Sequence, residues 1–170
     1  MKKLAESFAS ATHMVMPNDT NPLGNLMGGQ LMLWMDIISA ISAQKHCKSL
    51  VVTVSVDNVS FNHPIRLGDI VTLHAKVTRT FSSSMEVFIE VWVENFKTLT
   101  KIQSNTAFYT FVAVDANGKP IKVIEALPET EEEIQLHTGA IQRRNLRLML
   151  ANRLNPQEKI KLLNDLLNIK

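Results

Sequence analysis

The chain carries a single acidic residue in the middle of a long apolar segment. Asp36 is the only charged side chain between Gly28 and Lys45. A carboxylate in such surroundings costs several kcal/mol unless donors, charges or water compensate it. With suitable donors it can act as a general base or as a nucleophile on a carbonyl substrate. A core carboxylate held by a cap or an ion pair would give the same pattern, so Asp36 alone leaves both interpretations open.

Two glycines precede this acid at a position where a helix can begin. Backbone N–H groups at a helix N-terminus are free to bind an oxyanion or a thioester oxygen, and glycine allows close approach. Asp36 follows Gly29 by seven residues, which is about two helical turns. Gly28 and Gly29 would therefore place donors on the same helix as the acid, although the pair could simply end a loop.

Composition and periodicity predict the helix and the strands that surround these groups. Residues 17–29 are rich in Pro, Asn, Asp and Gly and predict a loop, and residues 29–44 predict a buried helix. Period-two alternation then predicts four strands, with turn signals between them. The strands are expected at 51–61, 69–81, 85–95 and 101–115. This order predicts an α+β fold in which an antiparallel sheet curls around one helix.

A second, helical segment follows Pro128. The sequence predicts a division into residues 1–127, which contain the candidate chemistry, and a helical extension, residues 128–170. A further short helix is expected after Pro156. Apolar residues of the extension need burial and are expected to pack on a neighbouring subunit. They are Ile134, Ile141, Leu148 and Leu154.

Composition narrows the class of protein. The chain has 170 residues, 45% hydrophobic residues, 20% charged residues and a net charge of +2, which does not favour nucleic-acid binding. A lone cysteine, Cys47, excludes an intrachain disulfide and favours a reducing compartment. The apolar run 31–43 is interrupted by Asp36 and is too short to span a bilayer. We therefore predict a cytoplasmic protein that binds neither membrane nor nucleic acid.

Other residues that could carry chemistry are less favoured. His63 lies at a proline turn. His46 and Cys47 are neighbours on a helix end, where their side chains point in different directions. A cluster of arginines in the extension could meet a phosphate, but a solvated helix face explains it better. These are Arg143, Arg144 and Arg147.

The stretch 19–36, DTNPLGNLMGGQLMLWMD, resembles the acyl-CoA hydrolase branch of the hotdog-fold thioesterases. Members carry an Asx-x-Asn, then Gly-Asn-x-x-Gly-Gly, then an acid in the helix, and this sequence keeps all three. The likeness continues through VVTVSVDNVSFNHPIRLGDIV, SSSMEVFIEVWVEN and FYTFVAVDANGKP, and covers roughly residues 12–120. It implies a hotdog fold, in which an antiparallel sheet wraps around a long central helix.

The resemblance also implies a reaction, the hydrolysis of acyl-CoA to fatty acid and CoA. Asp36 would activate water or attack the carbonyl, the amide of Gly28 or Gly29 would polarise the thioester oxygen, and Asn21 would act from a partner subunit. Because a thiolate leaves easily, no metal or cofactor is expected. The family further implies a homodimer, or a hexamer built as a trimer of dimers. CoA contacts are expected near a hairpin turn that could equally be solvated, at Arg79, Ser82 and Ser83.

Two alternatives stay open within the same fold. A hydratase or dehydratase would need a histidine paired with the acid, and the predicted helix contains none before His46. A non-catalytic acyl-CoA sensor could dispense with the acid and would usually carry a DNA-binding appendage. The presence of Asp36 and the lack of a basic DNA-binding segment favour the enzyme.

Overall fold

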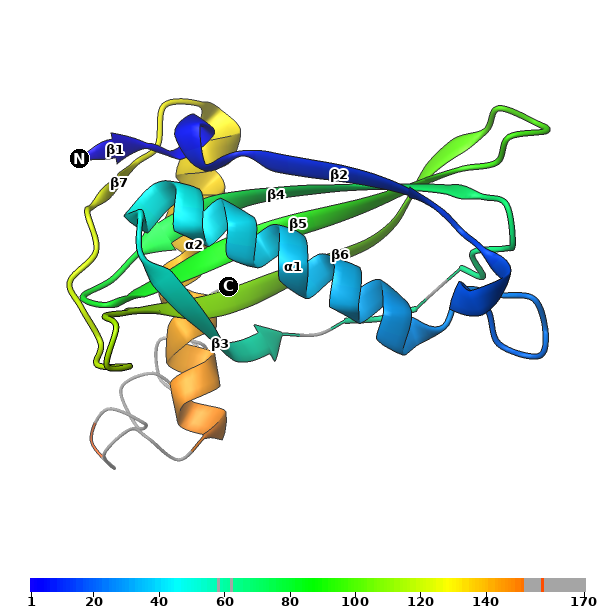
Figure 1. Cartoon of the computed structure of the whole chain (residues 1–170). Helices are drawn as coiled ribbons and strands as arrows, with labels where there is room; N and C mark the ends of the chain where they lie inside the picture. Colours follow the sequence, from blue (N-terminus) through cyan, green and yellow to red (C-terminus); the bar gives the residue numbers. More distant parts are fainter. Residues whose placement is uncertain (58, 62, 152–156, 158–170) are drawn as a thin grey trace. The chain divides into compact units, whose positions relative to one another are not determined.

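A computed structural model describes residues 1–57, 59–61, 63–151 and 157. The chain divides into two compact units, Met1–Glu129 and Thr130–Lys170. The first unit combines a five-stranded antiparallel sheet with the long helix α1 (Figure 1). It has the predicted α+β architecture, with one helix lying on the inner face of a curved sheet.

The sheet has the strand order β2-β4-β5-β6-β3, and every neighbouring pair is antiparallel. The strands are β2 (Ala9–Met14), β3 (Leu50–Asp57), β4 (Ile70–Thr80), β5 (Ser84–Glu94) and β6 (Lys101–Val114). The four predicted strands are confirmed, and β2 adds an edge that the sequence had not indicated. A short parallel pair, β1 (Lys2–Lys3) with β7 (Ala126–Leu127), lies outside this sheet.

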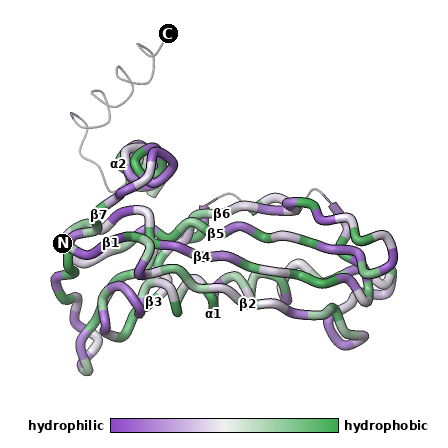
Figure 2. The backbone as a smooth tube through the Cα atoms, turned by 90° about the horizontal axis from the view of Figure 1, so that it is seen from above, coloured by the Kyte–Doolittle hydropathy of each residue, from purple (hydrophilic) through white to green (hydrophobic). Residues whose placement is uncertain are grey.

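Helix α1 (Gly28–Cys47) confirms the predicted buried helix and extends slightly beyond it at both ends. Its buried side chains recur every three or four residues, so one face packs on the sheet. Alternate residues of β4 and β5 belong to the hydrophobic core, and hydrophobic and hydrophilic residues follow one another along these strands (Figure 2). Four alternate residues of β4 are fully buried: Val71, Leu73, Ala75 and Val77. The core therefore lies between α1 and the inner face of the sheet.

The second unit contains α2 (Glu131–Leu150), which confirms the helical texture predicted after Pro128. Thr130 caps its N-terminus. The helix expected after Pro156, and the apolar position Leu154, lie outside the described residues. None of the helices within the described part of the chain is long and apolar enough to cross a membrane.

Candidate active site

The carboxylate of Asp36 is held by a hydroxyl from the sheet. Asp36 is half-buried near the middle of α1, and its Oδ1 accepts a hydrogen bond of 2.8 Å from Thr53 Oγ1. Thr53 lies on the edge strand β3, seventeen residues further along the chain. Sequence reasoning missed Thr53, because one threonine in a valine-rich strand carries no signal of its own. This hydrogen bond fixes the orientation of the acid.

A buried phenol from β6 shares the surroundings of this acid. Tyr109 is 1% exposed, and its hydroxyl has no hydrogen-bond partner among the described residues. Burial, and secondarily the negative charge of Asp36, raises the pKa of Tyr109 to about 12. The phenol therefore stays protonated at physiological pH.

The N-terminus of α1 presents backbone donors. Its first intrahelical hydrogen bond runs from the Leu31 N–H to the Met27 carbonyl at 3.1 Å, so the N–H groups of Gly28 and Gly29 precede the repeating pattern. The N-cap residue, Met27, provides no side-chain cap. The two glycines differ in their surroundings. A Cβ on Gly28 would lie 3.3 Å from Cζ of Phe61, whereas one on Gly29 would meet nothing within 4 Å.

Asn21 lies in a tight hairpin at this same end of α1. Its Oδ1 accepts the N–H groups of Leu23 and Asn25 at 3.0 and 3.2 Å. Further along the hairpin, the Met27 N–H donates to the Asp19 carbonyl, so the loop leads directly into the helix. The side-chain oxygen is thus used locally, and the amide Nδ2 is the donor that Asn21 can offer to a substrate.

One chain does not bring all of these groups together. Gly28 and Asp36 are eight residues apart on one straight helix, which corresponds to about 12 Å along its axis. Asn21 lies at the Gly28 end, and Thr53 lies beside Asp36. The predicted residues therefore form two halves, a donor half and an acid half.

The expected CoA contacts lie at the opposite end of α1. The end of β4 and the β4–β5 turn that follows it carry Arg79, Ser82 and Ser83. Thr80, beside this turn, accepts the Ala126 N–H at 2.9 Å, and Ala126 pairs with Lys2. The Lys2 ammonium donates in turn to the carbonyl of Lys45, which lies in the last turn of α1. The structure therefore does not bring this turn to Gly28 of the same chain.

The less favoured candidates have other roles. His46 Nε2 contacts the Ile124 carbonyl at 3.0 Å, and the Cys47 thiol donates to the Ser49 carbonyl at 3.6 Å, so they do not form a nucleophile–base pair. Burial lowers the pKa of His46 and raises the pKa of the Cys47 thiol. In the second unit, Arg143 donates to the Leu136 carbonyl of its own helix at 2.7 Å.

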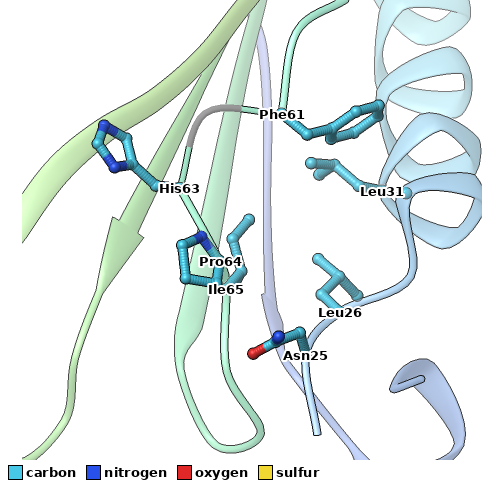
Figure 3. A pocket seen from close by; sticks show the side chains of 8 residues that line it. Asn25, Leu26, Leu31, Phe61, His63, Pro64 and Ile65 are labelled. Atoms are coloured by element: carbon cyan, nitrogen blue, oxygen red, sulfur yellow. The ribbon is translucent and has the colours of Figure 1, made fainter. Parts of the chain in front are cut away.

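A pocket opens beside the N-terminus of α1. Its volume is about 390 Å³, within the range usual for ligand sites. The Leu31 and Phe61 side chains lie next to each other on one side, while the His63 ring points away from them (Figure 3). The lining residues are Asn25, Leu26, Gly28, Leu31, Phe61, His63, Pro64 and Ile65. Within the described residues, no group of three or more His, Cys, Asp or Glu side chains could hold a metal ion.

Comparison with known protein families identifies the family to which this chain belongs. Residues 23–118 match the model of the thioesterase superfamily. The chain is also 48% identical over 142 residues to an uncharacterized acyl-CoA thioester hydrolase, YkhA, of Bacillus subtilis, covering 84% of this chain and 83% of that protein. The chain therefore belongs to the thioesterase superfamily, as the sequence motifs had indicated.

A second relative is a longer protein. The cytosolic acyl coenzyme A thioester hydrolase of Rattus norvegicus is 38% identical over 131 residues, which are 75% of this chain but 34% of the rat protein.

Solved structures confirm the hotdog fold. A hexameric apo acyl-CoA thioesterase is 38% identical, with a TM-score of 0.85 over 89% of this chain and 98% of that chain. The acyl-CoA hydrolase of Staphylococcus aureus, in complex with butyryl coenzyme A, coenzyme A and coenzyme A disulfide, is 36% identical. Its TM-score is 0.81, over 96% of this chain and 98% of that chain.

The Staphylococcus aureus enzyme has also been solved with alanine in place of an aspartate, a threonine or an asparagine. In that chain the asparagine precedes the aspartate by 15 residues and the threonine follows it by 17 residues. Asn21, Asp36 and Thr53 have these same separations here.

Proposed function

We propose that the chain hydrolyses acyl-CoA thioesters to a fatty acid and CoA, with Asp36 as the reacting acid. The observation that carries the proposal is the hydrogen bond from Thr53 to Asp36, on a helix that begins with uncapped glycine amides. The matching spacing of asparagine, aspartate and threonine in the Staphylococcus aureus hydrolase supports it.

In the proposed reaction, Asp36 takes a proton from a water molecule, and the oxygen of that water attacks the thioester carbonyl. The Gly28 N–H and Asn21 Nδ2 donate to the oxygen on which negative charge develops. The C–S bond then breaks, and the CoA thiolate receives the proton from Asp36. Direct attack by Asp36, followed by hydrolysis of the mixed anhydride, uses the same groups. No metal or cofactor enters either route.

In the proposed reaction, the two halves of the site come from different subunits. Reacting atoms approach within about 3 Å, and an oxyanion donor lies about 3 Å from its oxygen, so base and donor sit within about 7 Å of each other. The separation of about 12 Å along one helix exceeds this. We therefore place Asn21 and Gly28 of one subunit opposite Asp36 and Thr53 of its partner.

Exposed apolar residues beside Asp36 offer the surface for such a partner. Leu33, Ile37 and Ile41 recur every four residues on the outer face of α1 and are 52, 50 and 41% exposed. The edge strand β3 adds exposed Val52 and Val54. An apolar face next to an open strand edge favours association with a second copy. We propose a homodimer, assembled as a trimer of dimers like the hexameric relative, in the cytoplasm, where the rat relative is named as acting.

The turn that carries Arg79, Ser82 and Ser83 is proposed to bind the CoA phosphates. Arg79 supplies a guanidinium group, which suits phosphate recognition. We expect Arg79→Ala to raise KM for acyl-CoA and to leave kcat unchanged, since the turn lies away from the reacting atoms.

A hydratase is not favoured, because His46 follows Asp36 by ten residues, about 15 Å along the helix, and its Nε2 contacts the Ile124 carbonyl.

Thiol release from acetyl- to palmitoyl-CoA tests the proposal. Asp36→Asn should lower kcat by about 10²–10⁴-fold, the usual range for loss of a general base. Asp57→Asn is the matched control, since Asp57 is also half-buried and accepts a hydroxyl hydrogen bond, from Ser55 at 3.0 Å. Equal loss in both variants, or a wild type that hydrolyses no acyl-CoA, would refute the assignment of Asp36.

A further inference from the structure

Three buried apolar side chains line the pocket beside Gly28, together with the polar side chains of Asn25 and His63. Leu31 is 1% exposed, Ile65 is 5% exposed and Leu26 is 9% exposed, and all three side chains line it. The CoA arm contains amides and phosphates, and burying these against such walls without hydrogen bonds would be costly. An aliphatic chain carries no such cost. Of the two arms that leave a thioester carbonyl, the pocket therefore suits the acyl arm.

Gly28 connects this pocket to the proposed chemistry. The residue lines the pocket with its own backbone, and its N–H is one of the donors at the start of α1. A carbonyl oxygen bound at that N–H places the first carbons of the acyl chain at the pocket mouth. This step rests on the proposed function, because it takes the Gly28 amide as a donor to the thioester.

Phe61 fills the space next to Gly28. Its ring tip lies 3.3 Å from the position of a Cβ on Gly28, with both Cε atoms at 3.5 Å. The ring lies beside Leu31 and forms one wall of the pocket (Figure 3). Phe61 is 51% exposed, so its ring can be exchanged with little change to the hydrophobic core.

We infer that this pocket binds the acyl chain and that Phe61 sets the length of chain it accepts. Each methylene that enters an apolar pocket gains about 0.8 kcal/mol, which is about fourfold in kcat/KM. The gain stops where the chain meets the wall. Removing the Phe61 ring lengthens the accepted chain, and a larger ring shortens it.

The test compares kcat/KM for butyryl-, octanoyl- and palmitoyl-CoA in the wild type, Phe61→Ala and Phe61→Trp. Phe96→Ala is the matched control, because Phe96 is also 51% exposed and its ring also lies against a glycine, Gly68. For Phe61→Ala, the ratio of palmitoyl- to butyryl-CoA should rise at least about tenfold, the gain from two further methylenes. It should fall in Phe61→Trp and stay unchanged in Phe96→Ala.

Two results would overturn the inference, and they differ in what else they refute. An active enzyme in which Phe61→Ala changes all chain lengths by the same factor would mean that the pocket does not bind the acyl chain, and the proposed hydrolase activity would stand. A wild type that releases no thiol from any acyl-CoA would refute the proposed function, and the role of the pocket with it.

Discussion

The two long helices begin in different ways. At the N-terminus of α2, Thr130 Oγ1 accepts the Glu133 N–H at 3.2 Å, and the Glu133 side chain accepts the Thr130 N–H at 3.4 Å. At the N-terminus of α1, Met27 provides no side-chain cap and is followed by Gly28 and Gly29. Capping residues stabilise a helix by about 1 kcal/mol, so α1 forgoes a stabilisation that α2 has. The difference agrees with the proposal that the amides of α1 bind a ligand, whereas those of α2 are satisfied within the fold.

Of the changes at the two helix starts, the removal of one amide of α1 should have the strongest effect. Gly28→Pro deletes the N–H at the first helical position, where proline is well tolerated. Met27, with φ −66° and ψ 134°, already has a backbone conformation that suits a following proline. We expect kcat for acyl-CoA hydrolysis to fall by about 10²–10³-fold, as for loss of an oxyanion donor.

Gly28→Ala is the control for this substitution, because it keeps the N–H and adds only the Cβ that meets Phe61. It should retain clearly more activity than Gly28→Pro. Equal losses in the two variants would show that crowding against Phe61, and not the amide, matters at this position.

A change at the cap of α2 should affect stability alone. Thr130→Ala removes the side-chain acceptor for the Glu133 N–H, and the free energy of unfolding should fall by about 1 kcal/mol. Thr130→Asn, which keeps an acceptor, should recover most of it. Denaturant unfolding measures both, and kcat should stay at the wild-type value. A loss of kcat in folded Thr130→Ala would contradict the proposal that the start of α2 affects stability alone.

The second glycine of α1 should be nearly indifferent. A Cβ on Gly29 meets nothing within 4 Å, and alanine restricts the unfolded chain, so Gly29→Ala should raise the free energy of unfolding by about 0.5 kcal/mol. Activity should not change, since the N–H remains. If thiol release by Gly29→Ala falls as far as it does in Gly28→Pro, the region around Gly29 also takes part in the site.

The smallest effect is expected from His46, near the C-terminus of α1, which should change the free energy of unfolding only at acidic pH. Burial lowers the pKa of His46 from 6.5 in the folded chain, so the unfolded chain binds this proton more readily. The contribution to stability is therefore complete above pH 6.5 and is lost as pH falls through the folded-state pKa. His46→Gln should remove that part of the acid dependence of unfolding, as measured by denaturant unfolding at a series of pH values. An unchanged profile in His46→Gln would contradict this role.

Most of the fold could be predicted from the sequence because its signals are local. Period-two alternation marked β3 to β6, and a long apolar segment after two glycines marked α1. Strand β2 was missed, since ASATHM mixes small and polar residues and lies at a sheet edge. Asp36 was found because a charge in an apolar segment is visible in the sequence.

The rest of the site depends on contacts between distant segments. Thr53 meets Asp36 only after β3 has joined the sheet, and Phe61 meets Gly28 only when the segment after β3 folds over the start of α1. Neither contact produces a periodic pattern in the sequence. The division of the site into two halves likewise follows from a length along α1, not from a motif.

We propose that each active site combines Asn21 and Gly28 of one subunit with Asp36 and Thr53 of its partner. Activity restored by mixing two inactive variants, Asn21→Ala and Asp36→Ala, tests this most directly. A mixed dimer has one site with both residues intact, so co-expression in equal amounts should recover about a quarter of wild-type thiol release. If the co-expressed, mixed dimers are no more active than either variant alone, the two residues act within one subunit and the account of a shared site is wrong.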